Sequence, residues 1–186
     1  MKNVNRLVVG HLNINSIRNK FQPLVKLIKG NIDICVLTET KIDSSFPVKQ
    51  FDIEGYFQFR QDNKNGAGGI IIYIRDDIPC RELNNHPVSL NIQGIFLEIN
   101  LRKSKWLLFG GYNPIKSNIN AFTDTLGSIL DHNMQHLEMF LLLGDFNSET
   151  RENTMTDFCD IYNLKNIVIG PTCFKILLTP VQLTLC

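Results

Sequence analysis

Residues 140–149 read FLLLGDFNSE, an apolar run that ends at a glycine and is followed by an acid and an amide. The run has the length of a buried strand, and Gly144 marks its end. Asp145 and Asn147 are two positions apart, so on an extended chain both side chains point above the same edge of a sheet. An acid that polarises water beside an amide that holds an oxyanion would suit hydrolytic chemistry. Turn formation explains the same residues without any chemistry, because Asp and Asn favour turns.

The chain on either side of this stretch alternates between short apolar runs and amphipathic segments. The strand–helix–strand order over residues 6–38 predicts a βαβ-like unit or two strands of a layered α/β sandwich. Residues 42–52 are expected to form a polar loop. We expect strands at 6–14, 32–38, 56–60, 68–75, 88–100, 105–112, 139–144 and 167–169, and helices at 19–29, 118–133 and 155–162.

The composition is that of one globular domain. The 186 residues are 44% hydrophobic and 20% charged, and the formal net charge of +1 means that any nucleic-acid binding must rest on a local patch. The five cysteines contain no C-x-x-C pair, which favours free thiols in a reducing compartment over disulfides or zinc. No apolar run approaches a membrane-spanning length. We therefore expect an intracellular protein, nuclear or cytoplasmic, with no membrane contact and no obligate protein partner.

Two familiar kinds of active site are excluded by their local sequence context. The glycines at 66, 68 and 69 precede a predicted strand instead of a helix, so they do not form a phosphate-binding loop. No G-x-S-x-G motif occurs, and the four histidines are interpreted as ordinary core or surface residues.

Polar side chains at the ends of predicted strands are the better candidates. Glu39 and Asp145 each follow an apolar run, Asn13 leaves the first strand, and Tyr112 ends another. Such residues would meet on the rim of a sheet sandwich. Carboxylate oxygens suit Mg²⁺, which keeps much of its water and binds through one or two carboxylates together with substrate phosphate.

Six segments occur in an order that resembles a known superfamily: HLNINSI (11–17), DICVLTETK (33–41), GGIIIYIRDD (68–77), GGYNP (110–114), LLLGDFNSE (141–149) and GPTCF (170–174). Together they resemble the endonuclease/exonuclease/phosphatase superfamily and, more narrowly, the apurinic-type endonuclease domain of LINE-type (non-LTR) retrotransposons. The resemblance spans roughly residues 6–174. It implies a DNase I-like four-layer α/β sandwich that cuts phosphodiesters, DNA as the partner, and Mg²⁺ or Mn²⁺ as the cofactor.

The resemblance also implies roles for individual residues. Asn13 corresponds to an asparagine that hydrogen-bonds near the phosphate, and Glu39 to the metal-binding glutamate. Tyr112 corresponds to a tyrosine that orients the scissile phosphate. Asp145 corresponds to the residue that aligns or deprotonates the attacking water, and Asn147 to its transition-state partner. Structural roles remain open for two of them, since Asn13 could only end a strand and Tyr112 could only fill the core.

Near its C-terminal end the sequence departs from the family pattern. Thr172 corresponds to a site-lining threonine, or else caps a turn, but the Ile-Asp and Ser-Asp-His segments that should follow are missing. We therefore expect residues 1–174 to form an endonuclease domain that lacks its last strands, and residues 175–186 to be an aberrant, frameshifted tail. Three functions remain: a metal-dependent endonuclease domain of retrotransposon origin that nicks DNA, a catalytically inactive remnant of one, or a host phosphodiesterase of the same superfamily.

Overall fold

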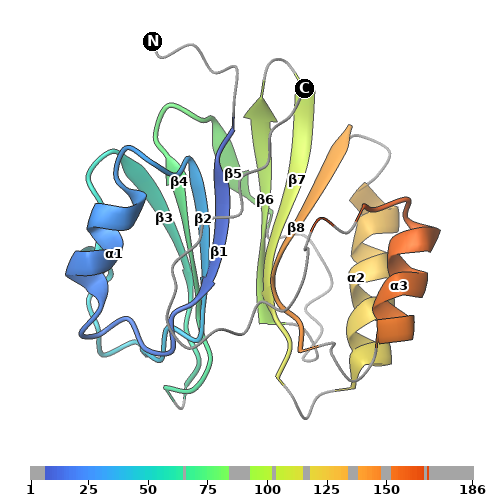
Figure 1. The fold of residues 1–186 in the computed structure, drawn as a ribbon, viewed down its shortest axis with the longest axis horizontal. Helices are drawn as coiled ribbons and strands as arrows, with labels where there is room; N and C mark the ends of the chain where they lie inside the picture. The colour runs from blue at the N-terminus through green and yellow to red at the C-terminus, as the bar shows by residue number, and fades with distance from the viewer. Residues whose placement is uncertain are drawn as a thin grey trace.

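Two four-stranded sheets face each other, with helices on their outer surfaces, in the computed structural model of the chain (Figure 1). The structure describes residues 7–64, 66–83, 93–101, 104–114, 118–133, 138–147, 152–165 and 167. The first sheet has the order β1-β2-β4-β3, from Val9–Asn13, Ile34–Thr38, Ile70–Arg75 and Tyr56–Gln61. The second has the order β5-β6-β7-β8, from Cys80–Glu82, Gln93–Leu101, Ser104–Tyr112 and Met139–Asp145. The helices are α1 (Phe21–Ile28), α2 (Ile119–Asn133), α3 (Glu152–Ile161) and the short 3₁₀ helix η1 (Val48–Phe51).

The predicted four-layer α/β sandwich is confirmed. Helix α1 covers the outer face of the first sheet, and α2 and α3 cover the outer face of the second (Figure 1). Most predicted elements are present within a few residues of their expected bounds. The expected strand at 68–75 begins only at Ile70, because Gly68 and Gly69 adopt left-handed backbone angles (φ 75° and 86°). Residues 88–92, most of the strand expected at 167–169 and the tail at 175–186 lie outside the described residues.

Two parallel strand pairs set the position of the polar strand ends. β1 and β2 are parallel and joined through α1, with Asn13 opposite Thr38. β7 and β8 are parallel and joined through α2, with Tyr112 opposite Asp145. Parallel strands present their carboxyl ends at the same edge of a sheet, and β1 packs against β8 across the sandwich. The carboxyl ends of all four strands therefore gather at one end of the molecule.

Among the described residues, the hydrophobic core consists of three clusters of buried side chains. Between the sheets lies a cluster to which β4 contributes Ile70, Ile72 and Ile74, whereas Ile71 and Tyr73 of the same strand pack on the α1 side. A strand that is buried on both faces reads as an unbroken apolar run, which explains the IIIYI sequence. The third cluster joins α2 and α3 to the second sheet through Phe96, Phe109, Phe122 and neighbouring residues. The end of the sandwich at which the four strand ends gather is thus supported by a close-packed core.

Three cysteines fall in the described part, and all are free thiols, as expected. Cys35 is buried, and burial raises the pKa of its thiol to about 12, whereas Cys80 and Cys159 are only partly buried. In the described part of the chain, no helix is both long enough and apolar enough to span a membrane.

Candidate active site

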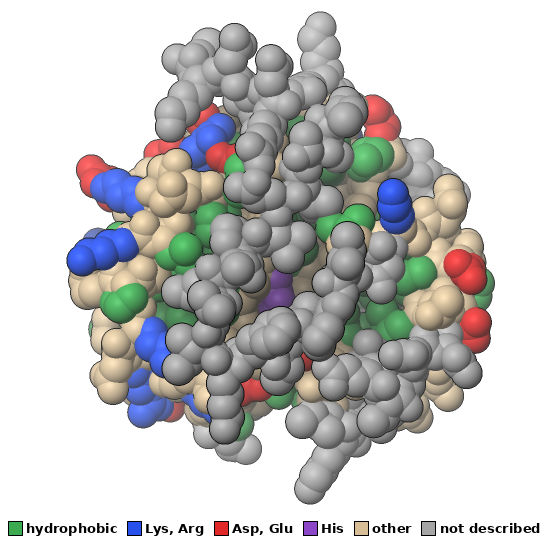
Figure 2. Space-filling view, viewed as in Figure 1, with side chains coloured by type: hydrophobic (Ala, Val, Ile, Leu, Met, Phe, Trp, Pro, Cys, Tyr) green, Lys and Arg blue, Asp and Glu red, His purple; other side chains and the backbone are tan. Residues whose placement is uncertain are grey.

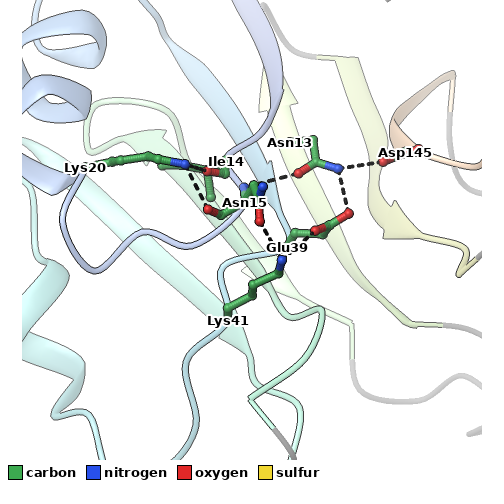
Figure 3. A network of polar contacts seen from close by, with 7 residues as sticks. All are labelled: Asn13, Ile14, Asn15, Lys20, Glu39, Lys41 and Asp145. Carbon is green, nitrogen blue, oxygen red and sulfur yellow. Dashed lines mark hydrogen bonds and ion pairs between the residues drawn. The ribbon is translucent and has the colours of Figure 1, made fainter. Parts of the chain in front are cut away.

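Three polar side chains from different strands meet at the gathered strand ends (Figure 3). The side-chain nitrogen of Asn13, at the end of β1, donates hydrogen bonds to Glu39 Oε1 and to Asp145 Oδ2, each at 2.8 Å. Glu39 follows β2 in the first sheet, and Asp145 ends β8 in the second. One amide therefore links two carboxylates that belong to opposite sheets and are more than a hundred positions apart in the chain.

The orientation of the Asn13 amide is fixed by the backbone that follows it. Asn13 Oδ1 accepts a hydrogen bond of 3.2 Å from the backbone N–H of Asn15. The carbonyl end of the amide is thus occupied, and its two N–H bonds point at the carboxylates of Glu39 and Asp145. The family role of Asn13, a hydrogen bond near the phosphate, stays a prediction; its contacts here are with the two acids.

The loops that carry these residues hold an unusual concentration of left-handed backbone. Asn15, Ser16, Glu39 and Lys41 all have positive φ angles, between 44° and 77°, although none is glycine. Each such residue costs on the order of 1–3 kcal/mol and persists only where surrounding contacts impose it. Here the loops hold one another: the backbone N–H of Ser16 donates to Glu39 O at 2.8 Å, and that of Lys41 donates to Gly68 O at 2.9 Å.

Tyr112 and Lys41 complete the surroundings of Glu39. Lys41 Nζ lies 3.2 Å from Glu39 Oε2, and the Tyr112 side chain hydrogen-bonds the Glu39 carboxylate. Burial, the negative charges of Glu39 and Asp145, and this hydrogen bond all raise the pKa of Tyr112 above its ordinary value. The phenol therefore stays protonated at neutral pH and can donate a hydrogen bond.

Asn147 does not lie where an extended chain would place it. Its φ is +47°, so the chain turns immediately after β8. Its backbone N–H approaches Asp145 Oδ1 at 3.3 Å, and its side-chain nitrogen donates to the carbonyl of Asn113 at 2.8 Å. The expectation that Asp145 and Asn147 point the same way along a strand is wrong, and the turn interpretation of Gly-Asp-Phe-Asn describes the local backbone correctly.

His11 lies in the same strand as Asn13, two residues earlier, and so on the same face of the sheet. Its Nε2 lies 3.0 Å from Thr38 Oγ1. Burial lowers the pKa of His11 to about 4, against the charge of Asp145, which raises it. The ring is therefore neutral at physiological pH and half-buried, which agrees with its interpretation as an ordinary core or surface residue.

The donor set fits a magnesium or manganese ion better than zinc. Glu39 and Asp145 offer hard carboxylate oxygens, and both bond one nitrogen, so the bonded oxygens are at most twice 2.8 Å apart. Two like charges this close favour a bound cation. Among the described residues, no group of three or more His, Cys, Asp or Glu side chains gathers around one point, as a structural zinc site would require. Magnesium needs only one or two protein carboxylates.

Four of the six residues named from the sequence thus lie together: Asn13, Glu39, Tyr112 and Asp145. Asn147 is adjacent but directed at Asn113, and Thr172 lies outside the described residues. Sequence reasoning missed the contacts of Asn15 and Lys41 with this group. Lys41 is only two residues from Glu39 in the sequence, but both residues have left-handed backbone angles, so their contact does not follow from the alternation of a strand.

No protein-family model and no curated protein matches the chain, but solved structures do. NExo, a 3′ phosphatase from Neisseria solved with a product DNA hairpin, is 21% identical over 76% of this chain and 58% of its own (TM-score 0.55). The AP endonuclease LMAP from Leishmania major is 14% identical over 83% and 66% (TM-score 0.60). The endonuclease domain of TRAS1, a telomere-specific non-LTR retrotransposon, is 12% identical over 82% and 70% (TM-score 0.56).

This chain spans only 58% of the length of the Neisseria phosphatase, and all three identities are low. At such identities a structural likeness carries the fold and leaves activity to be argued from the site. The two facing mixed sheets, their outer helices and these matches show that the chain has the DNase I-like fold of the endonuclease/exonuclease/phosphatase proteins.

Proposed function

We propose that this chain is a divalent-metal-dependent phosphodiesterase domain that nicks DNA. The observation that carries the proposal is the convergence of Glu39 and Asp145, from opposite sheets, on the single amide of Asn13. Glu39 would hold Mg²⁺ or Mn²⁺. A bound divalent ion supplies charge neutralisation on the phosphoryl oxygens and the leaving oxygen.

Asp145 is the residue best placed to direct the attacking water. Asn13 holds its Oδ2, and the backbone N–H of Asn147 approaches its Oδ1 at 3.3 Å. Both donors fix the direction of the carboxylate, which still has lone pairs to accept a hydrogen bond from water. A carboxylate fixed in this way orients water and accepts its proton as attack proceeds.

Tyr112 would bind the phosphate as a neutral donor. Its raised pKa keeps the O–H group intact at neutral pH, and Tyr112 lies opposite Asp145 in the β7–β8 register. A neutral donor adds no further charge to a site that already holds two carboxylates. It can therefore hydrogen-bond a phosphoryl oxygen as negative charge develops there.

The finer assignment is a nicking domain of retrotransposon origin. The likeness to the TRAS1 endonuclease domain supports it, together with the order of the six sequence segments. The competing candidate is a folded domain of this kind without activity. A phosphodiesterase of the same fold that acts on another substrate is the third possibility.

Nicking of supercoiled plasmid DNA separates these candidates. The account expects nicking with Mg²⁺ or Mn²⁺ and none in EDTA, with Glu39→Gln and Asp145→Asn slowing it by about a thousandfold, equivalent to about 4 kcal/mol. Glu54→Gln is the matched control, because Glu54 is an exposed acid paired with Lys29. Nicking that persists in EDTA and in both site variants would refute the mechanism. If the unaltered chain does not nick DNA, the candidate of a folded domain without activity is favoured.

A further inference from the structure

Two lysine side chains reach the same residue beside the candidate active site (Figure 3). Lys20 Nζ donates to the backbone carbonyls of Ile14 at 2.6 Å and Asn15 at 2.8 Å. Lys41 Nζ donates to the side-chain oxygen of Asn15 at 2.5 Å and lies 3.2 Å from Glu39. Asn15 therefore holds one ammonium group with its backbone and the other with its side chain.

The positive charge of this pair is only partly neutralised. Both contacts of Lys20 are with neutral carbonyl oxygens, and no ion pair of Lys20 occurs among the described residues. Lys41 shares the charge of Glu39, but its other partner, Asn15, is a neutral amide. An aspartate at position 15 would offer the same two oxygens and cancel one positive charge. The asparagine leaves that charge in place.

A purely structural explanation accounts poorly for two lysines here. Lys20 lies just before α1 and ties the loop after β1, a task that any neutral donor could perform. Ordering two long, flexible side chains costs conformational entropy, and neutral oxygens return little of it. Asn15 and Lys41 also adopt left-handed backbone angles, which adds to the cost. Compared with neutral donors, the two lysines add a fixed positive charge at an exposed position.

The position of the pair relative to the acids indicates what it would bind. Lys20 and Asn15 lie on the side of Asn13 away from Asp145, with Lys41 beside Glu39 (Figure 3). On the face drawn in Figure 2, most of the described lysine and arginine side chains lie on the side of the molecule that holds α1 and the first sheet. A phosphodiester being cut at the Glu39–Asp145 pair would thus continue toward the two ammonium groups.

We propose that Lys20 and Lys41, held by Asn15, form a phosphate-binding subsite for the DNA strand next to the bond that is cut. The inference rests on the proposed phosphodiesterase function and assigns it a substrate contact. Each ammonium group carries three N–H donors, so both can donate a hydrogen bond to a phosphate oxygen while they keep their contacts with Asn15. The subsite adds affinity for the DNA backbone next to the bond that is cut. A chain of net charge +1 cannot supply this affinity through its overall charge.

The test measures binding of a short labelled DNA duplex to the 186-residue Asp145→Asn protein, by fluorescence anisotropy, between about 50 and about 200 mM salt. Adding Lys20→Gln and Lys41→Gln together is expected to weaken binding about ten- to a hundredfold at low salt. It should also reduce the slope of log affinity against log salt by about one. Lys26→Gln is the control, because Lys26 is a lysine of α1 outside this group, and its slope should not change.

Asn15→Asp tests the same subsite without removing a lysine. It keeps both acceptor oxygens and adds a negative charge, so it should weaken binding and lower the salt slope in the same direction. The conservative Lys20→Arg and Lys41→Arg pair should restore the slope. Binding of the glutamine pair that equals that of Lys26→Gln would overturn the subsite while the proposed function stands. An Asp145→Asn protein that does not bind DNA at all would overturn both.

Discussion

Replacing Asn13 with alanine should destabilise the protein through the two acids that its amide now links. In the native site the amide nitrogen donates to Glu39 and Asp145 at 2.8 Å each. Alanine removes both donors, so the repulsion between the two carboxylates, which the hydrogen bonds of the amide now offset, loses that compensation, and Lys41 remains beside Glu39. The repulsion between the acids then opposes folding, and a divalent cation relieves it.

The size of this repulsion follows from the geometry. The two N–H bonds of an amide diverge by about 120°, so the bonded oxygens of Glu39 and Asp145 are about 5 Å apart. Coulomb's law then gives about 3 kcal/mol at an effective dielectric constant of about 20 and about 1 kcal/mol at about 80. The site is partly exposed, so we expect Asn13→Ala to lower the free energy of unfolding by about 1 to 3 kcal/mol in EDTA.

Urea denaturation in EDTA and in Mg²⁺ measures this directly. The loss caused by Asn13→Ala should be large in EDTA and much smaller in Mg²⁺. The matched control is Asn13→Ala combined with Asp145→Asn, which removes one of the two like charges and should recover stability in EDTA. The reasoning fails if the loss is the same in both solutions and if the second substitution recovers nothing.

Three further outcomes are expected. Because the pKa of His11 is lowered from 6.5 to about 4, the unfolded chain binds the proton first as the pH falls. The free energy of unfolding should therefore drop by about 2 kcal/mol between about pH 7 and pH 5, and His11→Gln should remove that part of the drop. Gly110→Ala places a Cβ 2.6 Å from Ile72 of β4 and should lower the free energy of unfolding, measured with heat or urea, by about 1 to 3 kcal/mol. Gly10→Ala is the control and should lower it less, because the nearest atom to its Cβ is 3.5 Å away. Tyr112→Phe should lower kcat/KM for plasmid nicking about ten- to a hundredfold while changing stability by less than about 1 kcal/mol, because it removes only the hydroxyl beside Glu39 and keeps the ring that packs against the core between the sheets; an unchanged kcat/KM would remove Tyr112 from the mechanism.

The layers and most elements could be predicted because the apolar pattern records burial directly. The IIIYI run of β4 is buried on both faces, and the helical spacing of 21, 24, 25 and 28 marks the face of α1 that meets the first sheet. β5 was missed because Cys80–Glu82 is short and mostly exposed, so its sequence has no apolar alternation. β5 is held in place by its antiparallel pairing with β6 and by the Arg81–Glu98 ion pair.

The candidate site was predicted in part for a related reason. Parallel strands share the edge at which they end, which groups Asn13 with Glu39 in the first sheet and Tyr112 with Asp145 in the second. The two groups meet because β1 packs against β8 across the sandwich. Their bonds depend on backbone angles that the sequence pattern does not show. The positive φ of Asn147 turns its side chain toward a backbone carbonyl, and that of Glu39 sets its carboxylate between an amide and Lys41.

A crystal structure of the protein soaked in Mn²⁺ tests the central claim most directly, because manganese is located by its anomalous scattering. The account predicts one ion bonded to a Glu39 oxygen at about 2.0–2.2 Å, with Asp145 beside it and the Asn13 amide still directed at the two acids. An ion that binds elsewhere, or Glu39 and Asp145 carboxylates that lie far apart in the crystal, would contradict it.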